Sequence, residues 1–123
     1  MIFKSKTVNA AIFDMDGTML DTERLRCKTL TQSSIELFGS PISYKVLHSS
    51  LGLSPSKAEE LAKNAYGNHY PYIDIRRRAD ELELATIRSR GIPVKNGLYE
   101  VLDRLKKKRN TLGCCNVQSH RDR

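Results

Sequence analysis

A chain of 123 residues is long enough for one modest hydrophobic core. Apolar residues make up 39% and charged residues 28%, a balance typical of a globular protein rather than a disordered one. No apolar run approaches the roughly 20 residues that span a bilayer, and the first residues lack the apolar stretch and cleavage site of a signal peptide. These features predict a cytoplasmic protein with no membrane partner.

The net charge of +7 comes from the second part of the chain. Residues 76–123 hold 13 basic and 6 acidic side chains, whereas residues 1–75 hold eight of each. The basic runs at 76–78 and 106–109 fall inside helical patterns without interleaved aromatic residues, so they favour a solvated helix face and no specific nucleic acid. Nucleic-acid binding stays open as a third alternative. Cys27, Cys114 and Cys115 are odd in number and form no C-x-x-C pair, which predicts structural thiols.

In chain order, the apolar run at 8–13 predicts a buried strand. A helical pattern covers 21–38, and its inward face is predicted to hold Leu25, Leu30, Ile35 and Phe38. Further helices are predicted at 44–51, at 55–66 with Ser54 as the N-cap, and at 72–90. The inward face of the last of these is predicted to hold Ile75, Ala79, Leu82 and Ile87. Pro93 predicts a loop before the next helix.

That helix is expected at 97–108, capped by Asn96, with an apolar stripe of Leu98, Val101, Leu102 and Leu105. The run "TLGCCNV" from Thr111 predicts a second strand, which this helix allows to lie parallel to the first. The helical block between the two strands is too long for an ordinary crossover, so it predicts an inserted small domain. The predicted fold class is α/β.

Two carboxylates, Asp14 and Asp16, follow the first predicted strand, where open α/β folds build their sites. A carboxylate can attack phosphorus, and a second one can move the proton of the leaving oxygen. Gly17 allows a sharp turn whose amides approach phosphate oxygens, and Mg²⁺ would offset the clustered negative charge. A calcium loop is excluded because Leu25 stands where its final Glu is needed. A purely structural turn remains open from these residues alone.

The segment "AIFDMDGTMLDTE" resembles the first motif of the haloacid dehalogenase superfamily of phosphohydrolases. The helical block resembles the four-helix cap of that family. The segments "LGLSPSKAEEL" and "GIPVKNGLYEVLDRLKKK" are similar to members related to β-phosphoglucomutase and phosphoglycolate phosphatase. The resemblance covers about 8–110. It implies a partial Rossmann-like core of parallel strands at 1–20 and 91–123, with a helical cap at 21–90.

The resemblance also implies roles for individual residues. Asp14 matches the nucleophile and a Mg²⁺ ligand, and Asp16 matches the general acid/base, which offers the metal its backbone carbonyl. Gly17 and Thr18 match the phosphate-binding turn. The family's second motif ends in a Ser or Thr whose hydroxyl binds the phosphate. Ser119 is the candidate for this residue, although Asn116 and Val117 stand nearer the expected position.

The implied function is Mg²⁺-dependent hydrolysis of a small phosphorylated metabolite, such as a sugar phosphate, through an aspartyl-phosphate. The residues after Gly52 lack the arginine of many mutases, which favours phosphatase over phosphomutase. The family's third and fourth motifs, a lysine and further acids, do not follow. We therefore expect an incomplete form that is inactive alone and self-associates through an exposed sheet edge. The alternative is a non-catalytic helical interaction module, or a fragment of a two-chain assembly.

Overall fold

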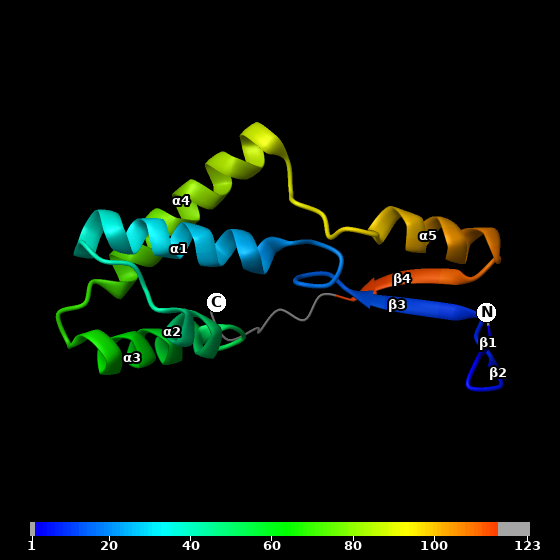
Figure 1. Ribbon diagram of the computed structural model, residues 1–123, viewed down its shortest axis with the longest axis horizontal. Helices are drawn as coiled ribbons and strands as arrows, with labels where there is room; N and C mark the ends of the chain where they lie inside the picture. Colours follow the sequence, from blue (N-terminus) through cyan, green and yellow to red (C-terminus); the bar gives the residue numbers. More distant parts are fainter. Residues whose placement is uncertain (1, 116–123) are drawn as a thin grey trace. The chain divides into compact units, whose positions relative to one another are not determined.

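The computed structural model describes residues 2–115, which divide into two compact units (Figure 1). One unit combines the chain up to Thr22 with the chain from Ile92 onward, and the other runs from Glu23 to Gly91. The elements follow the order of two short strands, one strand, four helices, a fifth helix and a last strand. The predicted α/β class and its parallel strand pair are confirmed.

In the first unit, β3 (Ala10–Asp14) and β4 (Thr111–Cys115) pair in parallel, with Asp14 opposite Cys115. The helix α5 (Leu98–Lys107) leads directly into β4 and lies along it (Figure 1). Leu105 is the buried residue of this helix. The sheet therefore has one helix-covered face, and the carboxyl ends of both strands lie at the same edge.

The prediction that the first strand is buried is wrong. Exposure alternates along β3, and the side chain of Ile12 is 76% exposed while Phe13 is half-buried. A two-stranded sheet with a helix on one face leaves the alternate side chains of each strand in solvent. Burial of Ile12 would need a second layer that the described residues do not supply.

A short antiparallel hairpin precedes this sheet and was not predicted. It joins β1 (Ile2–Phe3) to β2 (Lys6–Thr7) through Lys4 and Ser5, whose φ angles are 46° and 63°. Positive φ at both central residues is the geometry of tight hairpin turns, which usually hold Asn or Gly. A Lys-Ser pair carries no such signal, so the sequence pattern gave no reason to expect a turn.

The second unit is helical and consists of α1 (Thr22–Phe38, whose first residue belongs to the other unit), α2 (Tyr44–Ser50), α3 (Pro55–Tyr66) and α4 (Tyr72–Arg90). Its buried core gathers apolar and aromatic side chains from all four helices and their loops: Leu30, Ile42, Leu47, Ala58, Ala62, Tyr70, Tyr72, Ile75 and Ala79. No helix within residues 2–115 is long and apolar enough to cross a membrane.

The inward face predicted for α1 is only partly correct. Leu25 and Leu30 are buried, but Ile35 is 50% exposed and Phe38 is 37% exposed. The buried stripe continues instead through two small hydroxyl residues, Ser33 and Ser34, whose hydroxyl groups both donate to backbone carbonyls. Polar residues can occupy a buried stripe when their hydrogen bonds are satisfied.

The apolar faces predicted for α4 and α5 are only partly buried. Ile75 and Ala79 of α4 are buried as expected, while Val101 of α5 is exposed. Ser54 is the N-cap residue of α3 as predicted, although its side chain makes no capping hydrogen bond. The predicted cap of α5 is wrong, because its N-cap residue is Gly97, with a left-handed φ of 87°, rather than Asn96.

Candidate active site

Asp14 is the last residue of β3 and its side chain is exposed. Its Oδ1 accepts a hydrogen bond of 3.0 Å from the backbone N–H of Met15. This local bond turns the carboxylate toward the chain that follows, while the other oxygen has no protein donor among the residues that the structure describes. The end of the strand therefore presents a carboxylate oxygen that a substrate can approach.

The six residues after Asp14, 15–20, fold back on themselves in a tight loop (Figure 1). The backbone N–H groups of Met19 and Leu20 both donate to the Met15 carbonyl at 3.0 Å, and the Gly17 N–H donates to the Leu20 carbonyl at 2.9 Å. Gly17 has a φ of 76°, a left-handed conformation that costs glycine little and other residues more. The glycine in the motif is thus explained by the turn that it makes.

Asp16 lies in this loop, and the neighbouring helix α1 holds its side chain. The hydroxyl of Thr22, the first residue of α1, donates to Asp16 Oδ1 at 2.9 Å. A hydrogen bond to a carboxylate is stronger than one between neutral groups, so it restricts the rotamer of Asp16. Thr22 was not predicted as a site residue, although it follows the motif directly.

The loop is fastened to the returning chain before α5. The Asp21 N–H donates to the Pro93 carbonyl at 2.9 Å, and the Lys95 N–H donates to the Met19 carbonyl at 3.0 Å. The ammonium of Lys95 lies 3.3 Å from Asp21 Oδ1. We call this pair of segments, 19–21 and 93–95, the clamp. It fixes the far end of the loop that carries Asp16, and it joins residues that no local pattern could have linked.

Of the predicted site residues, Asp14, Asp16, Gly17 and Thr18 share this one loop. The Gly17 N–H is already used within the turn, whereas Thr18 is exposed and its N–H has no partner within residues 2–115. Thr18 is therefore the better placed of the two to meet a phosphate. Ser119, Asn116 and Val117 lie outside the described residues.

Asp14 and Asp16 offer hard oxygen ligands of the kind that Mg²⁺ prefers. In the described part of the chain, no group of three or more His, Cys, Asp or Glu side chains is arranged to hold a metal ion. The pair nevertheless fits an open site, because Mg²⁺ is commonly bound by one or two carboxylates together with waters and substrate phosphate. The donor set is compatible with this ion but does not enclose it.

Comparison with known proteins gives a consistent family assignment. The sequence model described as "Haloacid dehalogenase-like hydrolase" matches residues 11–121. The fold is similar to a Thermotoga maritima protein provisionally named a β-phosphoglucomutase, with 23% identity, 94% of this chain and 52% of that chain covered, and a TM-score of 0.62. A subfamily IA hydrolase of this superfamily from Geobacter sulfurreducens shares 22% identity over 92% of this chain and 53% of that chain, with a TM-score of 0.59.

The CbbY protein of Rhodobacter sphaeroides is also similar, with 19% identity, 93% of this chain and 53% of that chain covered, and a TM-score of 0.57. The chain thus spans about half the length of these solved structures. No curated protein matches the sequence. Because the family match covers most of the chain and includes the D-x-D-G loop, the chain belongs to the haloacid dehalogenase-like hydrolases.

Proposed function

We propose that this chain carries the nucleophile and the general acid/base of a Mg²⁺-dependent phosphomonoester hydrolase. The observation that supports this most directly is the loop after β3. It sets Asp14 at a strand end with an accessible carboxylate oxygen, and it holds Asp16 two residues later through the Thr22 hydroxyl. Family membership supports hydrolase chemistry at the same loop.

In the proposed reaction, an oxygen of Asp14 attacks phosphorus, and the bond from phosphorus to the ester oxygen breaks. Asp16 donates its proton to that leaving oxygen. Water then attacks the phosphorus of the aspartyl-phosphate and gives a proton to Asp16, and the bond from phosphorus to Asp14 breaks to release phosphate. The Thr18 N–H is available to a phosphate oxygen. When bound, Mg²⁺ would offset the negative charge that gathers between the carboxylates and the phosphate.

The proposed substrate is a small phosphorylated metabolite. CbbY of Rhodobacter sphaeroides has been solved with phosphate, and a variant of it with xylulose bisphosphate, which supports this substrate class for a chain of similar fold. The alternative of a non-catalytic helical module needs neither carboxylate. The two proposals therefore differ in what they expect when Asp14 and Asp16 are changed.

The test is turnover of a generic aryl phosphate with excess Mg²⁺, in any form of the protein that is active. Asp14→Asn is expected to abolish turnover, because an amide cannot form the acyl phosphate. Asp16→Asn is expected to lower the rate by about 10² to 10⁴-fold, the usual contribution of proton transfer. Asp103→Asn, an exposed aspartate on α5, is the matched control and should retain activity. Activity of Asp14→Asn above a few per cent would remove it from the role of nucleophile.

A further inference from the structure

Six basic side chains gather at one edge of the parallel sheet. Two lie on the hairpin before β3 and four lie where α5 turns into β4: Lys4, Lys6, Lys106, Lys107, Lys108 and Arg109. The two segments meet at this edge, because the Thr111 N–H donates to the Asn9 carbonyl at 2.8 Å. Figure 1 shows the hairpin and the end of α5 at the same end of the two strands. We call residues 2–9 and 105–111 the basic edge.

The basic edge contains six basic and no acidic residues, so its positive charge is not offset locally. All six side chains are exposed, and none of them forms an ion pair within residues 2–115. The proposed catalytic carboxylates lie elsewhere. Asp14 stands four residues along β3 from Ala10, about 13 Å away at the usual rise of a strand. The sheet therefore carries its cations and the proposed catalytic acids at opposite edges.

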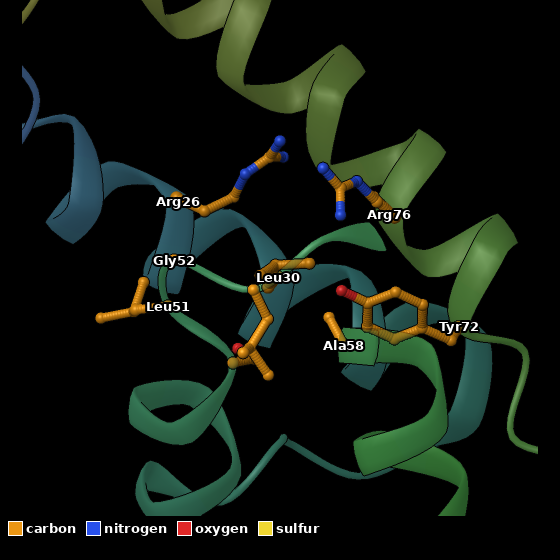
Figure 2. A pocket seen from close by; sticks show the side chains of 9 residues that line it. Arg26, Leu30, Leu51, Gly52, Ala58, Tyr72 and Arg76 are labelled. Atoms are coloured by element: carbon orange, nitrogen blue, oxygen red, sulfur yellow. The ribbon is translucent and has the colours of Figure 1, made fainter. Parts of the chain in front are cut away.

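The helical unit offsets most of its charge, since residues 23–91 hold eleven basic and eight acidic side chains. Arg26, for example, lies 2.6 Å from Asp80 and 3.1 Å from Glu83. Figure 2 shows the side chains of Arg26 and Arg76 directed toward one another across a cavity of this unit. Most of the net charge of +7 is thus concentrated at the basic edge.

The basic edge also exposes apolar side chains. Ile2 is 76% exposed and Phe3 is 63% exposed, on the hairpin that carries Lys4 and Lys6. The Lys4 ammonium lies 5.5 Å from the centroid of the Phe3 ring, so the cation and the ring share one small surface. Apolar side chains beside cations are typical of segments that lie at the boundary between water and lipid.

The four basic residues after α5 are held by backbone hydrogen bonds. The Arg109 N–H donates to the Lys106 carbonyl at 3.0 Å, and the Asn110 N–H donates to the Leu105 carbonyl at 3.1 Å. A helix C-terminus favours basic residues, which accounts for this run by itself. It does not account for the two lysines of the hairpin or for the exposed apolar side chains beside them.

We propose that the basic edge docks this chain on the surface of an anionic lipid bilayer. The six cations contact the anionic headgroups, while Ile2 and Phe3 enter the boundary between headgroups and acyl chains. A cluster of about four to eight Lys and Arg side chains is sufficient to attract a protein to such a surface. Nucleic acid would neutralise the same charge but would give Ile2 no apolar surroundings, so the combination favours lipid.

The contact is peripheral, so it needs no helix that crosses the membrane. The expectation of no membrane partner rested on the lack of such a segment and of a signal peptide, and neither bears on a surface contact. Docking through the basic edge would leave the loop of Asp14 and Asp16, at the other edge of the sheet, open to substrate. It requires neither carboxylate and is independent of the proposed hydrolysis.

The experiment is co-flotation of the 123-residue chain with lipid vesicles on a density gradient, which separates bound chains from aggregates because aggregates sink. One set of vesicles is phosphatidylcholine alone, and the other is equal parts phosphatidylcholine and phosphatidylserine. Binding is expected only to the anionic vesicles and should weaken as the salt concentration rises. The triple variant Lys106→Gln, Lys107→Gln, Lys108→Gln should bind about a hundredfold more weakly, since each cation near an anionic surface contributes about fivefold. Phe3→Ser should weaken binding about tenfold.

The matched control is a second triple variant, Lys45→Gln, Lys57→Gln, Arg88→Gln. These are exposed residues of the helical unit that form no ion pair in the described part of the chain, so the control removes the same charge and should bind like the unaltered chain. Far-ultraviolet circular dichroism checks that each variant remains folded.

Equal losses in the two triple variants would overturn the proposal, because binding would then follow net charge rather than the basic edge. So would equal binding to both kinds of vesicle, binding to neither, or a Phe3→Ser variant that binds as well as the unaltered chain. Binding to a DNA or RNA duplex at physiological salt, with no binding to anionic vesicles, would overturn it in favour of a nucleic-acid partner.

Discussion

Replacing Ser34 by alanine is expected to destabilise the helical unit more than replacing Tyr70 by phenylalanine. The two side chains are 0% and 1% exposed, and their oxygens lie 2.8 Å apart. The Ser34 hydroxyl also lies 2.7 Å from the Ser40 carbonyl, which can only accept. Serine has a single hydroxyl proton, so Ser34 donates to Ser40 and Tyr70 donates to Ser34. Burial raises the pKa of Tyr70, which keeps the phenol protonated for this role.

The magnitudes follow from which groups each change leaves without a partner. Ser34→Ala removes both hydrogen bonds and leaves the buried Tyr70 hydroxyl unsatisfied, which costs about 2 to 4 kcal/mol in free energy of unfolding. Tyr70→Phe removes one hydrogen bond, while Ser34 keeps its bond to Ser40, so the expected cost is about 0.5 to 1.5 kcal/mol. The double variant no longer contains the stranded hydroxyl. It should therefore be more stable than Ser34→Ala alone.

Urea unfolding followed by far-ultraviolet circular dichroism measures all four proteins of this cycle. The aromatic contacts of Tyr70, at ring distances of 4.7 Å from Phe38 and 4.9 Å from Tyr66, survive its change to phenylalanine, so the comparison isolates the hydroxyl. A double variant that is less stable than Ser34→Ala would refute the donor assignment. It would mean that the Tyr70 hydroxyl finds another partner once Ser34 is gone.

Three further outcomes are expected. The pKa of Glu36 is lowered, first by its hydrogen bond to Arg78. The pair therefore stabilises the folded state above the ordinary glutamate pKa of about 4.3, and this stabilisation is lost as the pH falls through the lower folded-state pKa. Glu36→Gln should make the free energy of unfolding depend slightly less on pH in the acid range, and an unchanged dependence would contradict this. Nucleic acid should bind weakly, with affinity that falls steeply as salt rises; fluorescence anisotropy that shows a sequence-specific complex at physiological salt would contradict it. The 123-residue chain alone should show no Mg²⁺-dependent phosphatase activity, because in the described part of the chain no basic side chain pairs with Asp14 or Asp16 to offset the charge that gathers on the phosphate. Turnover that disappears in Asp14→Asn would show otherwise.

Much of the fold follows from periodicity and from where helices must stop. The predicted ends of α1, α3 and α4 agree with the structure because a glycine follows each of them. Burial was harder to predict. Ile12 and Ile35 are apolar residues on predicted inward faces, yet both are exposed, because burial depends on what packs over a face. A sequence pattern shows which side chains share a face, but it does not show whether that face is covered.

For the candidate site, too, some residues could be predicted from the sequence and others could not. Asp14 and Asp16 could be singled out because two acids one residue apart at the end of a strand have no structural need to be there. Their supports could not, because Lys95 reaches Asp21 across more than seventy positions and no spacing rule joins them. The assignments of Asp14, Asp16, Gly17 and Thr18 to catalysis remain predictions, as does that of Ser119.

The clamp has a consequence for the order in which the chain acquires its structure. The parallel pair joins residue 10 to residue 111, a separation that makes direct pairing slow, since a long loop must close before any contact forms. The helical unit is built from neighbours in the sequence, and such contacts form early. Once the helical unit is folded, the segments 19–21 and 93–95 can form the hydrogen bonds of the clamp. The loop that must then close before β4 pairs with β3 is much shorter than the whole chain between the two strands. We therefore expect the clamp to form before β4 pairs with β3.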